Sequence, residues 1–273
     1  MGAAVASLLG LHGRPYLDLA PFIDTTPLLA LDDEICVGLT QVPLSMTGGS
    51  HRSMGIMPAS RADEAHGDYG EVLARLSPEA LREVMALGDE ESVPARASGY
   101  GEERAVPLSR RQLQFLKYRH GVYFPWSVYL ELMPGGAWTE KGAVARRFTR
   151  EAQRYFPRTL AFVESLPFAH VGSVKLLGLD AFQHGSVHRD AEPDPARAPD
   201  HFISFAPGRD KRVYLWDEAR GEKTVIDAKI YRFNDADYHG VEAAPFFRYS
   251  LRVDGVFGPD FLERLCRSLS GSR

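Results

Sequence analysis

The sequence predicts a mainly β fold with flanking helices, and three observations lead to this prediction. From residue 171 onward, the spacing of apolar residues changes from a helical period to the alternation of a strand. Short strands then recur about every ten residues, and clusters of Gly, Pro, Asp and Asn separate them. This pattern is typical of a sandwich or a barrel, and its eight-strand form with two sheets is the double-stranded β-helix, or jelly roll. We expect a jelly-roll core of the kind that cupins have.

The strands expected in this core cover residues 171–179, 202–205, 212–216, 223–227, 229–233 and 246–253. Each combines β-branched or aromatic residues with period-two alternation, and turn-forming residues bound it. A further strand or two is expected over residues 34–44, an apolar run that contains Ile, Val and Leu.

Three helices are expected before the core. The first begins after Ser77 as N-cap and ends at Gly88, with Pro at its first position. The second runs between residues 109 and 121. The third covers residues 143–166, where aromatic and aliphatic residues repeat at helical spacing and Pro157 is expected to kink or split the helix.

The length of 273 residues fits one domain. We expect residues 1–170 to supply N-terminal strands, a loop and buttressing helices. Residues 171–257 would form the catalytic core, and residues 258–273 a C-terminal helix. The sequence leaves open whether residues 58–108 form a lid over the core.

The composition excludes several classes of function. The net charge is −4, with 32 basic against 36 acidic residues, so no strong positive field favours nucleic acid or an anionic membrane. The two cysteines, Cys36 and Cys266, are too few and too distant in sequence for a disulfide framework or a zinc or iron–sulfur site. No stretch approaches about 18 apolar residues. We therefore expect a cytoplasmic protein with a small-molecule or peptide substrate, and the oligomeric state stays open.

Three residues in the C-terminal half form a candidate metal site: His188, Asp190 and His239. His188 and Asp190 are two residues apart, so on an extended strand both side chains leave on the same face. His239 would return on a neighbouring strand of the barrel. Two imidazoles and one carboxylate make the facial triad of non-haem Fe(II) enzymes, which leaves the opposite side of the metal open.

Arg248 and Ser250 form a candidate carboxylate site on the last predicted strand. Because they are also two residues apart, both face one side of that strand. A guanidinium can hold a carboxylate through two charge-assisted hydrogen bonds, and a hydroxyl adds a third. Apolar neighbours on the strand would keep such a pocket dry.

The combined pattern His188-x-Asp190, His239 and Arg248-x-Ser250 resembles the motif of the 2-oxoglutarate/Fe(II)-dependent oxygenases. Within that superfamily the chain resembles the aspartyl/asparaginyl β-hydroxylase-like group, which includes bacterial proline hydroxylases. The supporting segments are residues 42–44, 48–50, 155–157, 166–168 and 187–190.

The resemblance implies that His188, Asp190 and His239 hold Fe(II), and that Arg248 and Ser250 bind the distal carboxylate of 2-oxoglutarate. With O2 as second cosubstrate, such an enzyme hydroxylates an unactivated C–H bond. The resemblance implies an amino acid, a peptide or a natural-product intermediate as the substrate. The carboxylate of Asp190 favours hydroxylation over halogenation, because related halogenases have a small residue in its place.

Two functions from other classes stay open. A cupin-type metal-dependent dioxygenase or isomerase without 2-oxoglutarate would not need Arg248. A non-catalytic jelly-roll binding module would not bind Fe(II) at all. Desaturation or cyclisation on the same iron site is a third possibility.

Several further residues have both a structural and a functional interpretation. His184 could line the substrate side of the site, and His201 follows a proline-rich loop that could fold over the metal. Lys175 and the glycine-rich loop 47–52 could contact substrate. For each of them an ordinary role as a core, strand or turn residue is favoured over the functional one.

Overall fold

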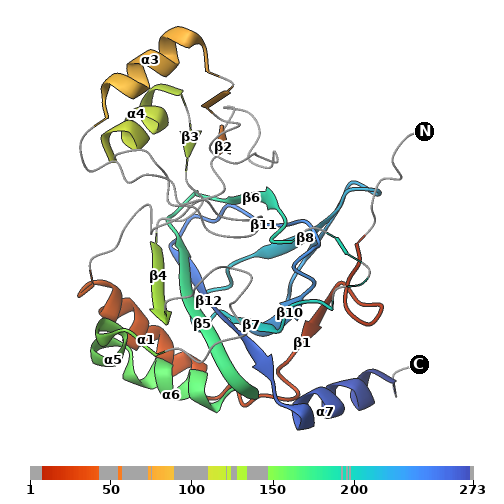
Figure 1. Cartoon of the computed structure of the whole chain (residues 1–273). Coiled ribbons are helices and arrows are strands. Elements are labelled where there is room, and N and C mark those ends of the chain that lie inside the picture. Colours follow the sequence, from red (N-terminus) through yellow and green to blue (C-terminus); the bar gives the residue numbers. More distant parts are fainter. Residues whose placement is uncertain are drawn as a thin grey trace.

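The computed structural model describes residues 8–42, 55–56, 73–74, 76–88, 110–120, 122–123, 128–133, 147–191, 193–194, 196 and 198–270. Two antiparallel sheets and a layer of helices make up most of this part of the chain (Figure 1). This arrangement confirms the predicted mainly β fold with flanking helices. Among the described helices, none combines the length and the apolar character needed to cross a bilayer.

The larger sheet has six strands in the order β1-β10-β7-β12-β5-β4, and every neighbouring pair is antiparallel. The strands are β1 (Tyr16–Asp18), β4 (Val128–Met133), β5 (Phe168–Leu179), β7 (Phe202–Phe205), β10 (Ile230–Phe233) and β12 (Arg248–Phe257). The long strands β5 and β12 pair along their whole length, and β12 lies between β5 and β7.

The smaller sheet has four strands in the order β6-β11-β8-β9. They are β6 (Gly185–His188), β8 (Val213–Asp217), β9 (Glu222–Val225) and β11 (His239–Val241). A separate short pair joins β2 (Gly55–Ile56) to β3 (Val122–Tyr123).

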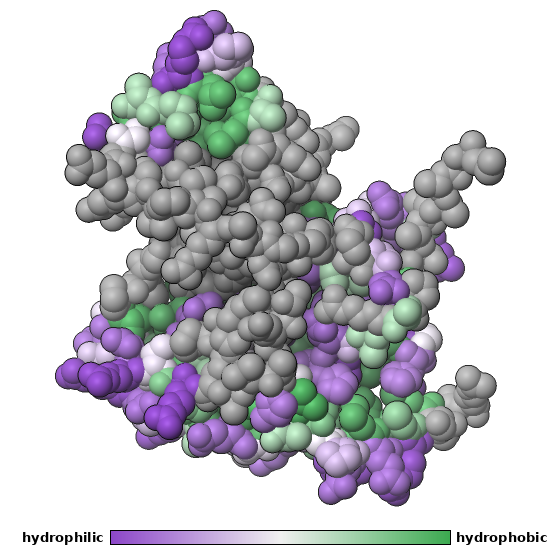
Figure 2. Space-filling view, viewed as in Figure 1, coloured by the Kyte–Doolittle hydropathy of each residue, from purple (hydrophilic) through white to green (hydrophobic). Residues whose placement is uncertain are grey.

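Four helices lie along the outer face of the larger sheet in Figure 1. They are α1 (Leu28–Leu39), α5 (Arg150–Tyr155), α6 (Pro157–Ser165) and α7 (Pro259–Ser270). The surface of this layer carries many hydrophilic side chains with smaller apolar areas between them (Figure 2). The helices α3 (Pro78–Ala86) and α4 (Arg110–His120) lie together, and the Gln112 amide donates to the Val84 carbonyl at 3.0 Å.

The two faces of β12 have different environments because its side chains alternate. Tyr249, Leu251 and Val253 belong to the main apolar core, which the helices also line. Arg248, Ser250, Arg252 and Asp254 occupy the opposite face and are all buried. The polar face of this strand therefore points away from the helical layer.

The polar face of β12 is directed toward the smaller sheet. Lys211, just before β8, donates to Ser250 of β12, and Arg252 of β12 donates to Asp190, just after β6. A second apolar cluster draws its members from both sheets, and they are Leu179, Phe202, Val213, Leu215, Ile226, Tyr231, Phe233 and Val241. The space between the sheets is thus a buried mixture of charged and aromatic side chains.

A carboxylate from α1 caps α6. The N-cap Phe156 has no side-chain hydrogen bond to this helix. Glu34 instead accepts from the backbone N–H groups of Arg158 and Thr159 and from the Thr159 hydroxyl, each at 2.8 Å. These bonds satisfy helix N–H groups that would otherwise be unpaired, and they fix α1 against α6.

The strand expected over residues 34–44 is wrong, because the chain forms α1 over Leu28–Leu39. The buried residues Leu28, Leu31, Ile35 and Leu39 follow helical spacing, and this stripe packs against the larger sheet. The apolar run at 34–44 misled the prediction because it starts in the middle of that stripe. The strand β4 was not anticipated either.

The remaining predicted elements correspond closely to the structure. The third helix is split at Pro157 into α5 and α6, as expected, but it begins only after Thr149, whose hydroxyl accepts from the Ala152 N–H at 3.0 Å. The first helix has the predicted cap, since Ser77 accepts from the Ala80 N–H. The second helix, the C-terminal helix and the core strands are also confirmed, with ends shifted by a few residues.

Candidate metal centre

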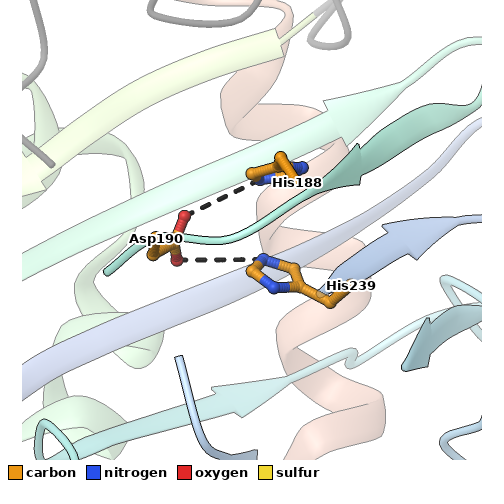
Figure 3. A group of neighbouring side chains, drawn as sticks. All are labelled: His188, Asp190 and His239. Atoms are coloured by element: carbon orange, nitrogen blue, oxygen red, sulfur yellow. Dashed lines mark ion pairs between the residues drawn. The ribbon is translucent and has the colours of Figure 1, made fainter. Parts of the chain in front are cut away.

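The structure brings His188, Asp190 and His239 together. Each offers one ligand atom, and the three atoms lie within 4.8 Å of one another. The Nε2 atom of His188 is 3.7 Å from Asp190 Oδ1, and the Nε2 atom of His239 is 3.8 Å from Asp190 Oδ2. Figure 3 shows the Asp190 carboxylate directed toward both rings. The geometry is that of a site for one cation.

Strand pairing positions the two histidines. His188 is the last residue of β6 and pairs directly with His239, the first residue of β11. Their ring centroids are 4.5 Å apart. Asp190 lies beyond the end of β6 rather than on it, so the shared strand face expected from the sequence is not what places it. Its backbone N–H donates to the Asp235 carbonyl at 2.9 Å, which holds this turn against the segment before β11.

A backbone carbonyl selects the tautomer of His239. Its Nδ1 atom is 3.0 Å from the Asp237 carbonyl oxygen, which only accepts, so Nδ1 carries the proton. The Nε2 lone pair is then directed toward Asp190 and the site. Burial and the nearby His188 lower the pKa of His239 to about 4. His239 is therefore a neutral imidazole at physiological pH, as a metal ligand must be.

The N-terminal segment fastens the loop that carries this carbonyl. The Asp237 carboxylate accepts from the backbone N–H groups of Leu9 at 2.6 Å and Gly10 at 2.8 Å. The Asn234 amide donates to the Gly10 carbonyl at 3.2 Å. Because Asp237 orients His239, a segment more than two hundred residues away in sequence supports the site.

Arg252 is a site residue that the sequence analysis missed. Its Nη1 atom donates to Asp190 Oδ2 at 2.6 Å, and its Nε atom donates to Asp254 Oδ1 at 3.0 Å. Burial opposes its charge, but Asp254 and Asp190 raise the pKa of Arg252 above its ordinary value. Its guanidinium also lies 4.0 Å from the centre of the Phe202 ring. The signal was available, because Arg252 continues the period-two series of Arg248 and Ser250.

Arg248 is almost fully buried, with 1% of its surface exposed, and backbone carbonyls surround its guanidinium. Nη1 donates to the carbonyls of Asp180 and Phe246, and Nη2 donates to those of Gln183 and Glu242. These bonds join the turn after β5 to the segment before β12. The predicted role of Arg248 in binding a carboxylate stays a prediction, and these contacts account for its burial without a ligand.

Ser250 contacts a buried lysine that the sequence analysis also missed. The Lys211 ammonium donates to Ser250 Oγ at 2.7 Å, and 4% of Lys211 is exposed. Burial, together with the positive charges of Arg248 and Arg252, lowers the pKa of Lys211 to about 7. Nothing in the sequence marked this lysine, because a polar turn before a strand is the usual place for an exposed one.

The secondary candidates lie outside the group of three. His201 stacks on Phe257, with ring centroids 4.6 Å apart, and its Nδ1 accepts from the Phe257 N–H at 3.1 Å, which is a structural role. His184 is buried just before β6, and Lys175 is buried on β5 opposite Arg252. The loop 47–52 and most of residues 58–108 lie outside the described residues.

Comparison of the sequence with known proteins does not assign the chain to a family. No family model matches the chain, and no curated protein matches it. Among solved structures, a 2OG-Fe(II) oxygenase family oxidoreductase from Burkholderia pseudomallei is similar at 13% identity and a TM-score of 0.31, over 46% of this chain and 66% of that one. A Pseudomonas putida prolyl-4-hydroxylase is similar at 13% identity and a TM-score of 0.27, over 83% of this chain and 97% of that one.

A third similar structure is the viral collagen prolyl hydroxylase of Paramecium bursaria Chlorella virus-1, at 11% identity and a TM-score of 0.26, over 46% of this chain and 77% of that one. The chain spans slightly less than two thirds of the Burkholderia protein. With TM-scores this low, the similarities establish neither the fold family nor the function of this chain. The case for a function therefore comes from the site itself.

Proposed function

We propose that the protein is an Fe(II)- and 2-oxoglutarate-dependent oxygenase that hydroxylates an unactivated C–H bond. The observation that carries the proposal is the convergence of two imidazole nitrogens and one carboxylate oxygen within 4.8 Å. Two histidines and one carboxylate are the donor set of non-haem Fe(II) oxygenases and leave metal positions open for substrates. The chain offers no cysteine to this group, and its Cys36 and Cys266 are both exposed.

The residues fit the metal. His188, Asp190 and His239 would hold Fe(II), and when bound there the iron would supply the oxidation of a C–H bond by O2 with 2-oxoglutarate as reductant. Arg252 fixes the direction of the Asp190 carboxylate through one oxygen. Phe233, whose ring centroid is 4.7 Å from that of His239, and Phe202 keep the inner side of the site apolar. A dry, rigid surrounding of this kind orients substrates and limits side reactions.

We also propose that the core is a double-stranded β-helix. Its support is the strand order, because β5, β7, β10 and β12 belong to the larger sheet while β6, β8, β9 and β11 belong to the smaller one. The chain thus passes repeatedly between the two sheets, as a jelly roll requires. The metal ligands then lie at one end of the smaller sheet, facing the interior.

The proposal of 2-oxoglutarate as cosubstrate is supported by the charged side chains buried between the two sheets. Buried cations on the inner side of the core include Lys175, Lys211, Arg248 and Arg252. Buried cations beside a metal site suit a dicarboxylate, of which one end would chelate the metal. The substrate class, an amino acid, a peptide or a natural-product intermediate, is proposed from the resemblance of the motif. The carboxylate of Asp190 supports hydroxylation rather than halogenation.

An anaerobic titration tests the proposal. Fe(II) and 2-oxoglutarate together should give the visible charge-transfer band of a keto-acid chelate, and His188→Ala and Asp190→Ala should lose it. The matched control is Asp33→Asn, since Asp33 is an exposed carboxylate on α1. A band that persists in either ligand variant would remove that residue from the metal site.

The two rival functions give different results in the same experiment. A cupin-type enzyme would bind Fe(II) but would not form the keto-acid band or release succinate. A non-catalytic module would not bind Fe(II) or Mn(II). If the band forms, succinate release stimulated by individual amino acids and peptides would then identify the substrate.

A further inference from the structure

We propose that Lys211, together with Ser250, binds the distal carboxylate of the dicarboxylate cosubstrate, and that Arg248 instead fastens the loops around this pocket. The inference rests on the proposed function and assigns a residue that the sequence motif does not include. It reverses the expectation that the guanidinium of Arg248 is the anchor.

The position of Ser250 relative to the metal ligands supports this assignment. The terminal Nη1 of Arg252 reaches Asp190 at 2.6 Å, so the metal centre lies within about one arginine side chain of this position on β12. Ser250 is the next residue on the same face of β12, about 7 Å away along the strand. A five-carbon diacid that chelates the metal at one end has a comparable length. Its far carboxylate would reach Ser250 and Lys211.

The hydrogen bond between Lys211 and Ser250 prepares the hydroxyl for an anion. Ser250 Oγ accepts from the Lys211 ammonium at 2.7 Å, so its own O–H can donate to a carboxylate. The ammonium and the hydroxyl would then hold the carboxylate as a pair. Both side chains are buried, which strengthens a charge-assisted bond.

The charge around Lys211 points to an anionic ligand. Burial and two neighbouring guanidiniums all oppose its ammonium form and lower its pKa to about 7. A cation held at such an electrostatic cost is characteristic of a functional site. A carboxylate bound next to it would offset the burial and the repulsion at once.

Arg248 is unsuited to binding the carboxylate because both terminal nitrogens of its guanidinium already donate to backbone carbonyls. The two terminal nitrogens of a guanidinium carry four N–H groups, and those of Arg248 donate to four backbone carbonyls. Only Nε lacks a partner. A single remaining donor cannot form the bidentate pair that the motif implies.

Ligand binding to the Mn(II)-loaded full-length protein tests the assignment. Calorimetric titration compares 2-oxoglutarate with 2-oxopentanoate, which has the same carbon chain and keto-acid head but no distal carboxylate. We expect Lys211→Met to weaken 2-oxoglutarate binding about 100-fold, as the loss of a buried charged partner does. Binding of 2-oxopentanoate and of Mn(II) should not change. Lys211→Arg should restore part of the affinity, and Arg264→Met, at an exposed cation on α7, should have no effect.

A measurement of stability distinguishes a loss of ligand affinity from a loss of the folded structure. Because Lys211→Met removes a disfavoured buried charge, its thermal unfolding midpoint should equal or exceed that of the wild type. Wild-type affinity for 2-oxoglutarate in Lys211→Met would overturn the assignment, and so would an equal loss of both keto acids. If the wild-type Mn(II) protein binds neither keto acid, the proposed function itself fails.

Discussion

Replacing Arg248 with Met tests whether this buried arginine holds the fold. The substitution removes four hydrogen bonds to carbonyls of the two segments that flank β6 and β12. A hydrogen bond from a charged donor contributes about 1.5–3 kcal/mol, and an unsatisfied buried carbonyl costs about 1–3 kcal/mol. Part of this loss is offset because the variant no longer buries a guanidinium. We therefore expect the free energy of unfolding to fall by about 3–5 kcal/mol.

Urea unfolding followed by far-UV circular dichroism measures this change. Arg82→Met on α3 is the matched control, because Arg82 is exposed and its ion pair with Glu79 at 3.1 Å lies on the surface. Such a pair contributes about 0–1 kcal/mol. If Arg248→Met is no less stable than this control, the four carbonyl contacts do not hold the loops, and the argument for a structural arginine fails. In the fraction that folds, 2-oxoglutarate affinity should fall far less than in Lys211→Met.

Three further predictions concern protonation, helix capping and the support of the metal site. At pH 8 the lowered pKa of about 7 leaves Lys211 mostly neutral between Arg248 and Arg252, so binding of 2-oxoglutarate should take up about one proton. Calorimetry in buffers of different ionisation enthalpy measures the uptake, which should vanish below pH 6 and in Lys211→Met. Glu34→Gln should lower the free energy of unfolding by about 1–2 kcal/mol, because α6 loses its charged cap; thermal unfolding measures this. Asp237→Asn should weaken Mn(II) binding about 10-fold in a titration followed by electron paramagnetic resonance. The amide keeps one acceptor oxygen for the two N–H groups of Leu9 and Gly10, so the loop whose Asp237 backbone carbonyl orients His239 is held less firmly.

Each of these three has an outcome that contradicts it. Buffer-independent enthalpies at pH 8 would show that Lys211 is not the group that gains the proton. Glu34→Gln should be compared with Asp33→Asn at the exposed neighbouring position, and equal stability of the two would exclude the cap. Unchanged Mn(II) affinity in Asp237→Asn would show that the N-terminal segment does not position His239.

The sequence predicted the core strands well because period-two alternation and turn residues are local signals. It failed at α1, where the helical stripe begins at Leu28 and β-branched residues occupy its second half. It also missed β4, whose pairing with β5 depends on partners 41 to 50 residues further along the chain. Elements that are fixed by tertiary partners leave a weaker local pattern than elements fixed by their own periodicity.

In the candidate site, too, some residues could be predicted from local sequence and others depend on tertiary contacts. His188, Asp190 and His239 could be found from their residue types and spacing, because the donor set of a metal limits the possible patterns. Lys211 could not be found in this way, since its burial depends on how the turn before β8 folds onto β12. Arg248 was correctly placed on the inner face of its strand, but the sequence gives no sign of the four carbonyls that surround it.

The ion pair between Asp190 and Arg252 has a consequence for how the protein would acquire its metal. Asp190 has a cationic partner supplied by the chain itself, so the carboxylate is compensated as soon as β6 and β12 come together. Folding of the two sheets should therefore not require a metal, and a chelator should not lower the thermal unfolding midpoint. A metal ion would then bind late and reversibly, at a carboxylate that the metal-free protein has already oriented.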